Sequence, residues 1–348
     1  MQRGRRVREE PRGGKRGVAG MADRLRVVVI GAGEMANRVH YPNLRSLDDV
    51  EVAALCDLDA ARLDETAKRW SVPMKFTDYR AMVDQVRPGA VYAIGQPHLM
   101  YDVWIWCLEQ GCNLFIEKPP GLTLHQAQVL AYLAEEHRAV TQVGFQRRSS
   151  PLLKKARQLC LDRGPVVHAV CEFYKYALTP LTTARDHMMD DGVHSIDTLR
   201  WACGGEVVHV ESSCRRIGTP DINWLTATLH FDNGSVGVLV NSWCSGRRLF
   251  RVELHSRGVF AEVDPENEAR VFVEGNSDGD RYQAAEVAGG EEFWAYAGFR
   301  AKHREFVDSI LTGIDSTSSP FRDAVKTMEV AEMVLAGSLF GRQTTWCQ

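Results

Sequence analysis

A carboxylate and an imidazole lie four residues apart in the segment Asp190–Asp197, which has the sequence DDGVHSID. With Thr198–Trp201 behind it, the segment is typical of a helix. Positions four apart on a helix share a face, so Asp190 and His194 are expected to point the same way, with Asp197 one turn further on. Such a pair can orient a general base and set its basicity. A solvated or hydrogen-bonded helical histidine is the alternative.

A glycine-rich turn near the N-terminus indicates a dinucleotide site. The apolar, β-branched run Leu25–Ile30 suits a buried parallel strand, and it continues into Gly31-Ala32-Gly33-Glu34-Met35-Ala36. Gly31 permits the tight turn, Gly33 lets the backbone approach a pyrophosphate, and Ala36 is small enough for close helix packing. The phosphates would lie at the N-terminus of the following helix, where free N–H groups favour an anion.

An acidic residue follows the next apolar strand, Val50–Cys56. Asp57 at that place can bind both ribose hydroxyls of NAD and would repel the extra phosphate of NADP. Arg62 is close enough in sequence that NADP stays possible. The alternative is that Asp57 only caps a strand-to-helix turn.

A lysine ends a third apolar strand within Asn113–Pro120. Prolines stop the strand directly after Lys118. This places Lys118 at the carboxyl end of a strand in an α/β sheet, where ligands of such folds bind. A partly buried lysine can hydrogen-bond a reacting oxygen. The alternative is an exposed lysine in an ordinary turn.

Taken together, these motifs resemble those of the Gfo/Idh/MocA family of glucose-fructose oxidoreductases and inositol dehydrogenases. The resemblance runs from about Arg24 to Gly341 and is carried by Gly31–Ala36, Glu117-Lys118-Pro119, Gly144–Arg148 and the pattern D-x-G-x-H-x-x-D in Asp190–Asp197. It implies that Lys118, Asp190 and His194 form the catalytic group. The cofactor contacts that it implies are Gly31, Gly33, Glu34, Met35, Ala36, Asp57, Gln96, Glu117, Lys118 and Gln146. The expected substrate contacts are Arg147, Tyr174, Asp197 and His194.

One segment departs from the family pattern, which usually shows T-P-N and a following His near the nicotinamide ribose. Here the segment is Ile94–Tyr101, expected as a loop, in which Gln96 and His98 flank Pro97. Tyr101 stands where the following His is expected. The contacts of this loop are therefore the weakest part of the resemblance.

The composition is that of a globular protein of ordinary polarity. The 348 residues carry a formal net charge of −3, which gives no whole-chain reason to expect nucleic acid or a membrane as a partner. Nine cysteines without a C-x-x-C motif predict reduced thiols in a cytoplasmic protein. The spacing of Cys, His and acidic residues predicts no metal site.

Three regions are expected along the chain. Residues 1–23 form a disordered basic extension, residues 24–144 an NAD(P)-binding Rossmann domain with a doubly wound parallel sheet, and residues 145–348 an α+β domain with a large, open, mostly antiparallel sheet. The second domain is expected to bind substrate and to form a homodimer or homotetramer through the sheet. Its expected strands are residues 166–176, 207–216, 224–231, 235–241 and 250–255, and its expected helices are 151–162, 299–312 and 321–340.

The predicted function is hydride transfer between a secondary alcohol of a sugar, inositol or related polyol and NAD, or NADP. His194 accepts the hydroxyl proton, Asp190 orients His194, and Lys118 donates a hydrogen bond to the oxygen. Two alternatives remain open. One is a non-catalytic NAD-binding, sugar-sensing regulator, and the other is a redox-neutral enzyme that uses tightly bound NAD transiently.

Overall fold

The first structural unit is a six-stranded parallel sheet. The structure, a computed structural model, describes residues 24–340, so the predicted basic extension of residues 1–23 lies outside the described residues. The strand order β3-β2-β1-β4-β5-β6 is that of a doubly wound dinucleotide-binding fold, as predicted. The strands are β1 (Leu25–Ile30), β2 (Val50–Cys56), β3 (Met74–Phe76), β4 (Ala90–Ala93), β5 (Leu114–Ile116) and β6 (Thr141–Val143).

Helices alternate with these strands, and several begin at a side-chain cap. They are η1 (Ala36–His40), α1 (Tyr41–Arg45), α2 (Ala60–Trp70), α3 (Tyr79–Val86), α4 (Pro97–Glu109) and α5 (Leu124–Glu136). Asp59 and Asp78 cap α2 and α3 through their carboxylates. Thr123 caps α5 by accepting a hydrogen bond from the backbone of Gln126.

The second unit is an eight-stranded sheet in the order β14-β13-β12-β11-β7-β10-β9-β8. Its strands are β7 (His168–Tyr176), β8 (Val207–Arg215), β9 (Trp224–Phe231), β10 (Val236–Ser242), β11 (Cys244–Ser256), β12 (Val259–Val263), β13 (Glu268–Val273) and β14 (Asp280–Gln283). The pairs are antiparallel except that β7 and β10 run parallel. The mostly antiparallel sheet is confirmed.

Helices cover one face of this sheet. They are α6 (Pro151–Leu161), α7 (Val193–Cys203) and α11 (Phe321–Phe340), while η2 (Gln146–Ser149), η3 (Met188–Gly192), α8 (Ala284–Ala288), α9 (Phe293–Tyr296) and α10 (Phe299–Thr312) complete the unit. Strand β9 alternates buried and half-buried residues, as expected where one face of a strand contacts a core. The turn Asp232–Gly234 joins β9 to β10.

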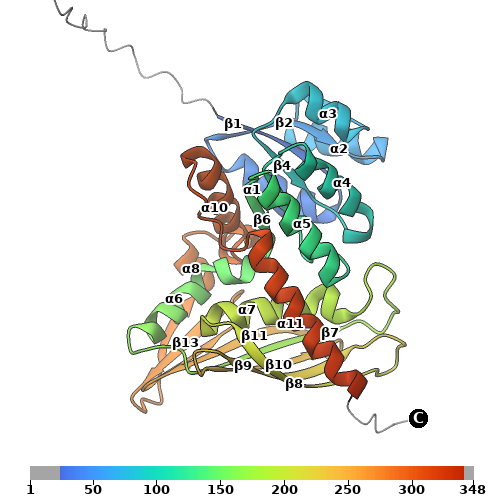
Figure 1. The fold of residues 1–348 in the computed structure, drawn as a ribbon. Helices are drawn as coiled ribbons and strands as arrows, with labels where there is room; N and C mark the ends of the chain where they lie inside the picture. Colours follow the sequence, from blue (N-terminus) through green and yellow to red (C-terminus); the bar gives the residue numbers. More distant parts are fainter. Residues whose placement is uncertain (1–23, 341–348) are drawn as a thin grey trace, which may run out of the picture.

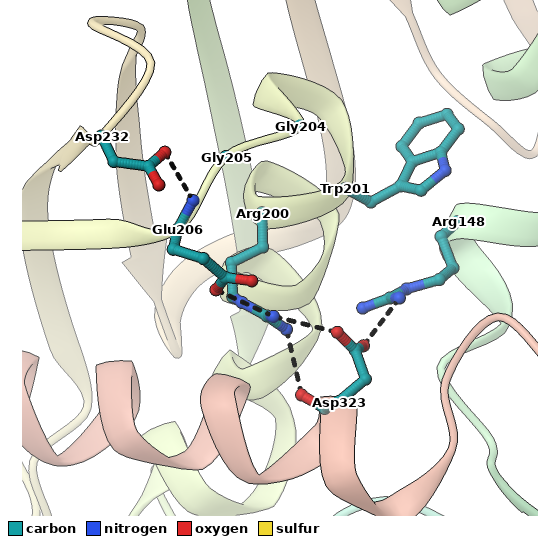
Figure 2. A pocket seen from close by; sticks show the side chains of 8 residues that line it. All are labelled: Arg148, Arg200, Trp201, Gly204, Gly205, Glu206, Asp232 and Asp323. Atoms are coloured by element: carbon teal, nitrogen blue, oxygen red, sulfur yellow. Dashed lines mark hydrogen bonds and ion pairs between the residues drawn. The ribbon is translucent and has the colours of Figure 1, made fainter.

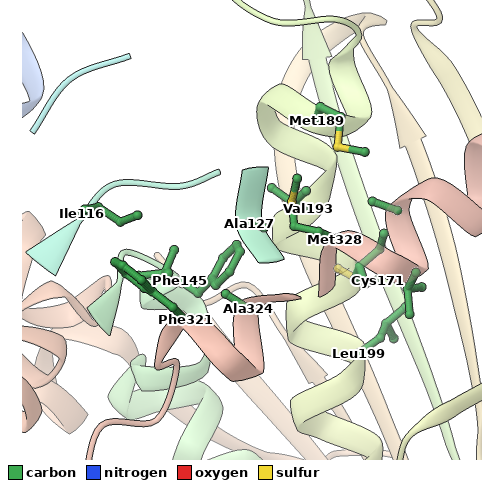
Figure 3. Close-up of a cluster of buried hydrophobic side chains, with 14 of the residues drawn as sticks. Ile116, Ala127, Phe145, Cys171, Met189, Val193, Leu199, Phe321, Ala324 and Met328 are labelled. Atoms are coloured by element: carbon green, nitrogen blue, oxygen red, sulfur yellow. The ribbon is translucent and has the colours of Figure 1, made fainter. Parts of the chain in front are cut away.

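Helix α11 links the two sheets into one core. In Figure 1 it runs from the parallel sheet at the top to the eight-stranded sheet at the bottom. Figure 3 shows its apolar residues Phe321 and Met328 in the same buried cluster as Phe145, close to β6, and Val193 of α7. The predicted division after residue 144 stays a prediction, because α10 also packs its Phe306 into the core of the parallel sheet. Helices α10 and α11 therefore pack both units against each other.

Two global properties follow from the described residues. Within residues 24–340 no helix is long and apolar enough to cross a bilayer. None of the eight cysteines in this part of the chain is joined to another in a disulfide. Cys107 and Cys203 are buried, at 0% and 5% exposure.

Candidate active site at the junction of the two sheets

The glycine-rich turn after β1 has the shape that a dinucleotide requires. Gly31 has a φ of 109°, and a Cβ atom there would lie 2.0 Å from the carbonyl oxygen of Ile94. A Cβ on Gly33 would meet no atom within 4 Å, so a ligand can approach the backbone there. The first N–H groups of the helical segment after Gly33 have no intrahelical acceptor and suit a pyrophosphate. The residues present therefore fit the predicted cofactor.

Asp57 holds this turn from the end of β2. Its Oδ2 accepts a hydrogen bond from the backbone of Ala32 at 2.7 Å, and its Oδ1 accepts one from Nη2 of Arg62 at 3.1 Å. The side chain of Arg62 is 56% exposed, whereas that of Asp57 is 10% exposed. Its two partners, Ala32 and Arg62, line a pocket of about 630 Å³ together with Gly33. The proximity of Arg62, noted from the sequence, is therefore a direct contact.

Lys118 follows β5 and reaches across to the second unit. Its Nζ donates hydrogen bonds to the backbone oxygen of Asp190 and to Oδ1 of Asp191, both at 2.8 Å. Burial lowers the pKa of Lys118, but the charges of Asp191 and Asp190 outweigh this effect and the net pKa is raised. Lys118 is therefore an ammonium group at neutral pH.

Asp190 and Asp191 belong to a π-helical turn, Met188–Gly192, and not to the α-helix expected from the sequence. A π-turn contains an extra residue, so it shifts the angular phase of Asp190 and Asp191 relative to α7. The expected orientation of His194 by Asp190 stays a prediction. Burial raises the pKa of Asp190, whereas the nearby Lys118 and Lys175 outweigh burial at Asp191 and hold its pKa well below the ordinary value.

His194 begins α7 and is 6% exposed. Its Nδ1 is buried, and none of the described residues 24–340 hydrogen-bonds its ring, so no hydrogen bond from Asp190 fixes the imidazole. Burial lowers its pKa well below the ordinary value, and the charges of Lys118 and Arg147 add to this effect. His194 is therefore a neutral imidazole at neutral pH, which can accept a proton.

Three residues that were predicted to contact the cofactor, Gln96, Gln146 and Glu117, differ in how far their side chains are exposed. Gln96 is exposed and precedes α4, so His98 and Tyr101 lie in this helix instead of in the loop that the sequence suggested. Gln146 is buried in η2. The Glu117 carboxylate pairs with Nε2 of His40 at 2.9 Å and accepts the backbone N–H of Lys118. That side chain is therefore bonded inside the protein, and the predicted cofactor contact through it is not supported.

Asp197 does not face the site, which corrects the predicted substrate contact. It is 1% exposed and pairs with Arg148, whose Nε lies 2.8 Å from Oδ2. Figure 2 shows Arg148 and Arg200 directed at Asp323 of α11, beside a pocket of about 300 Å³. The helical phase of Asp197 points it towards α11, and its role is to join α7 to η2 and α11.

Tyr174 also departs from the prediction. Successive side chains of a strand point to opposite faces, and the buried Phe173 faces the helices. Tyr174 therefore lies on the outer face, where its hydroxyl donates to Glu172 at 2.6 Å. Lys175, considered beside it from the sequence, points inwards and pairs with Asp191.

Arg147, the remaining predicted substrate contact, is buried below His194. Its guanidinium lies 3.9 Å from the centre of the Phe250 ring and donates to Glu266 at 3.0 Å. It is 4% exposed and acts on His194 through its charge. Arg147 and Arg148 lie in a 3₁₀ turn and have different partners, Glu266 and Asp197.

Comparison with known proteins gives the site its context. Residues 25–145 match the model of the oxidoreductase family with an NAD-binding Rossmann fold, and residues 163–258 match the model of the Gfo/Idh/MocA C-terminal domain. The chain belongs to the Gfo/Idh/MocA family. It is thus an NAD-binding oxidoreductase.

Relatives of this family align with about two thirds of their own length. The D-glucoside 3-dehydrogenase of Escherichia coli (strain K12) is 31% identical over 239 residues, which cover 61% of this chain and 68% of that relative. The myo-inositol 2-dehydrogenase of Thermotoga maritima is 25% identical over 232 residues, 63% of this chain and 68% of that relative.

Solved structures share the fold of this chain. A dehydrogenase from Chromobacterium violaceum has a TM-score of 0.82 and 22% identity, over 91% of this chain and 96% of that chain. GenD2 from gentamicin A biosynthesis, solved in complex with NAD, has a TM-score of 0.78 and 22% identity, over 95% of this chain and 98% of that chain.

Proposed function

We propose that the chain transfers hydride between a secondary alcohol of a sugar, inositol or related polyol and NAD. The observation that carries this proposal is the convergence of the Lys118 ammonium group, from the cofactor unit, with the Asp190–Asp191 turn and the neutral His194 of the second unit. Relatives named as glucoside and inositol dehydrogenases support the substrate class.

The roles follow from charge and protonation. In the oxidation direction His194 accepts the hydroxyl proton, which its neutral state allows. Lys118 donates a hydrogen bond to the oxygen as it becomes a carbonyl, and its positive charge favours the alkoxide-like state. The half-buried carboxyl of Asp190 completes the group beside Lys118. Reduction of a ketone would use the same groups in reverse.

The cofactor would be held mainly by the first unit. We propose contacts from Gly31, Gly33, Glu34, Met35 and Ala36 to the pyrophosphate region, with Asp57 at the ribose and Gln96 and Gln146 nearer the nicotinamide. Bound NAD supplies the hydride acceptor. Because Arg62 directly pairs with Asp57, it would also lie near the extra phosphate of NADP.

The experiment is a substrate panel of inositols, methyl glucosides and linear polyols with NAD and with NADP, followed by NADH or NADPH absorbance. Reduced cofactor formed with at least one polyol supports the proposal. Binding of a sugar without turnover would favour the regulator. Conversion of a glycoside without release of reduced cofactor would favour the redox-neutral enzyme.

We also propose that the outer face of the eight-stranded sheet joins two copies of the chain. The helices α6, α7 and α11 cover only the other face, and half-buried side chains such as Val238 and Val240 alternate along β10 on the outer face. Light scattering of the purified protein tests this, and a monomer at micromolar concentration would contradict it.

A further inference from the structure

Asp191 occupies the position that the pattern D-x-G-x-H leaves free, and the structure places it between two lysines. Its Oδ1 accepts a hydrogen bond from Lys118, and its Oδ2 accepts one from Lys175 of β7. The side chains of Lys118, Asp191 and Lys175 are 17%, 13% and 31% exposed. A carboxylate with one cation on each oxygen has a fixed orientation, and it joins three separate elements at the domain junction.

We propose that Asp191 is a positioning residue, which holds the ammonium group of Lys118 at the reaction centre and is itself fixed by Lys175. The proposal rests on the proposed function, because it assigns the reacting oxygen to Lys118. It adds two residues, one on η3 and one on β7, to the machinery of the site.

The geometry explains why Lys118 needs this support. A lysine carries its charge on a flexible four-carbon stem and has three N–H donors. Two of those donors are used by the backbone oxygen of Asp190 and by Asp191, both at 2.8 Å. These two acceptors fix the position of Nζ and leave its third N–H for the oxygen of the substrate.

The charges around Lys118 explain why a carboxylate is needed there. The charged and titratable groups that act electrostatically on Lys118 or His194 are Glu117, Arg147, Lys175, Asp190 and Asp191. His187 in turn interacts electrostatically with Asp190, and Arg248 interacts with Asp191 and Arg147. Lys118, Lys175 and Arg147 all place positive charge near the buried His194. Asp191 offsets that charge, so that without it the two ammonium groups would repel each other.

The test measures Lys118 directly, without needing catalysis. Trace labelling of the full-length protein with acetic anhydride over a pH series, followed by peptide mass spectrometry, reports the fraction of Lys118 that is unprotonated. Removing a carboxylate in contact lowers the pKa of a lysine by about one unit or more. In Asp191→Asn we expect Lys118 to label about tenfold faster at a fixed pH below its pKa, and we expect Asp191→Glu to restore most of the slow labelling.

Three further variants separate positioning from general damage to the turn. Asp186→Asn changes a buried carboxylate of the same region that pairs with Arg185 and caps Met189, and we expect no change in Lys118 labelling. Lys175→Gln should lower turnover less than Asp191→Asn does, and it should not speed the labelling of Lys118, because it removes a repelling positive charge. The double variant Asp191→Asn with Lys175→Gln should label less readily than Asp191→Asn alone, because one repelling charge is removed.

Kinetics provides the second readout. On a substrate found in the panel, Asp191→Asn should lower kcat by about 10²-fold, since a misplaced catalytic group has an effect of that size. KM should change less than about threefold, and the alkaline limit of the pH profile should move to lower pH. Unchanged labelling of Lys118 and an unchanged pH profile in Asp191→Asn would overturn the proposal. Altered labelling in a chain that oxidises no polyol would leave the positioning intact and would instead overturn the proposed function.

Discussion

The guanidinium of Arg148 and the carboxylate of Asp197 form a buried ion pair that joins η2 to α7, with Nε and Oδ2 2.8 Å apart. Arg148 also reaches Asp323 of α11, at 2.8 Å from Nη1. The last acidic residue of the D-x-G-x-H-x-x-D pattern is therefore part of the packing between elements and lies away from the reaction centre.

The first prediction concerns this ion pair. Asp197→Asn should lower the free energy of unfolding by about 3 kcal/mol, because it leaves the buried Arg148 with a single carboxylate partner. Urea unfolding measures the effect. In the fraction that stays folded we expect KM for the polyol to change less than about threefold. A large rise in KM with unchanged stability would restore Asp197 as a substrate contact.

Most elements of the fold could be predicted from the sequence because their signals are local. The strand at residues 224–231 and the helices at 299–312 and 321–340 were predicted with the bounds that the structure shows. Strands β12 to β14 were not predicted individually. They are short, and β14 is almost entirely exposed, so the burial pattern that marks a strand is weak there.

The candidate site was predicted less completely, because small changes of phase redirect side chains. The π-turn at Met188–Gly192 presents the carboxylate of Asp191 to Lys118, and no simple sequence signal marks such a turn. Tyr174 and Lys175 are neighbours on one strand, so their side chains point to opposite faces of the sheet. A prediction that is wrong by one residue therefore selects the side chain on the outer face and misses the one that faces the site. The neighbouring buried Phe173 was the available signal for this parity.

The second prediction concerns the cofactor. Asp57→Ala removes the acceptor of the Ala32 N–H and the expected partner of the ribose hydroxyls, so we expect KM for NAD to rise about thirtyfold, or about 2 kcal/mol. Asp57→Asn keeps an acceptor for Ala32 but removes the charge that repels a phosphate. It should therefore lose less NAD binding and should use NADP relatively better than the wild type does.

Kinetics with both cofactors, supported by calorimetric binding, measures these changes. Arg62→Ala provides a matched control, since Arg62 is exposed and pairs with the same carboxylate. We expect it to reduce the use of NADP by Asp57→Asn. Equal NAD affinity in wild type and Asp57→Ala would mean that Asp57 only caps the turn.

The third prediction concerns stability at low pH. Burial alone would raise the pKa of Glu305, but Lys302, Ser318 and Lys154 outweigh it and lower the pKa from 4.5 to about 2. A carboxylate whose pKa is lower in the folded state stabilises the protein above the pKa of the unfolded chain, and this stabilisation is lost as the pH falls through about 2. Glu305→Gln should therefore reduce the free energy of unfolding at pH 7 by on the order of 3 kcal/mol.

Urea unfolding from pH 7 to pH 2 measures how this difference depends on pH. The difference between wild type and Glu305→Gln should shrink as the pH falls below about 4.5. Glu135→Gln on the exposed side of α5 serves as the control and should change stability by less than about 0.5 kcal/mol. A difference that stays constant over the pH range would show that Glu305 acts through packing and not through its charge.

The last prediction concerns the proton acceptor. His194→Ala should lower kcat by about 10² to 10⁴-fold, the usual contribution of a general base, while NAD binding stays within about twofold of the wild type. Because burial and Lys118 hold the pKa of His194 well below its ordinary value, wild-type oxidation should lose no activity to protonation of His194 between pH 6 and pH 8. His194→Gln keeps a polar side chain of similar length without a basic nitrogen, so it should be as slow as His194→Ala. Full turnover of either variant would assign proton transfer to another group, and Asp190, whose pKa is raised by burial, would then be the next carboxyl to replace.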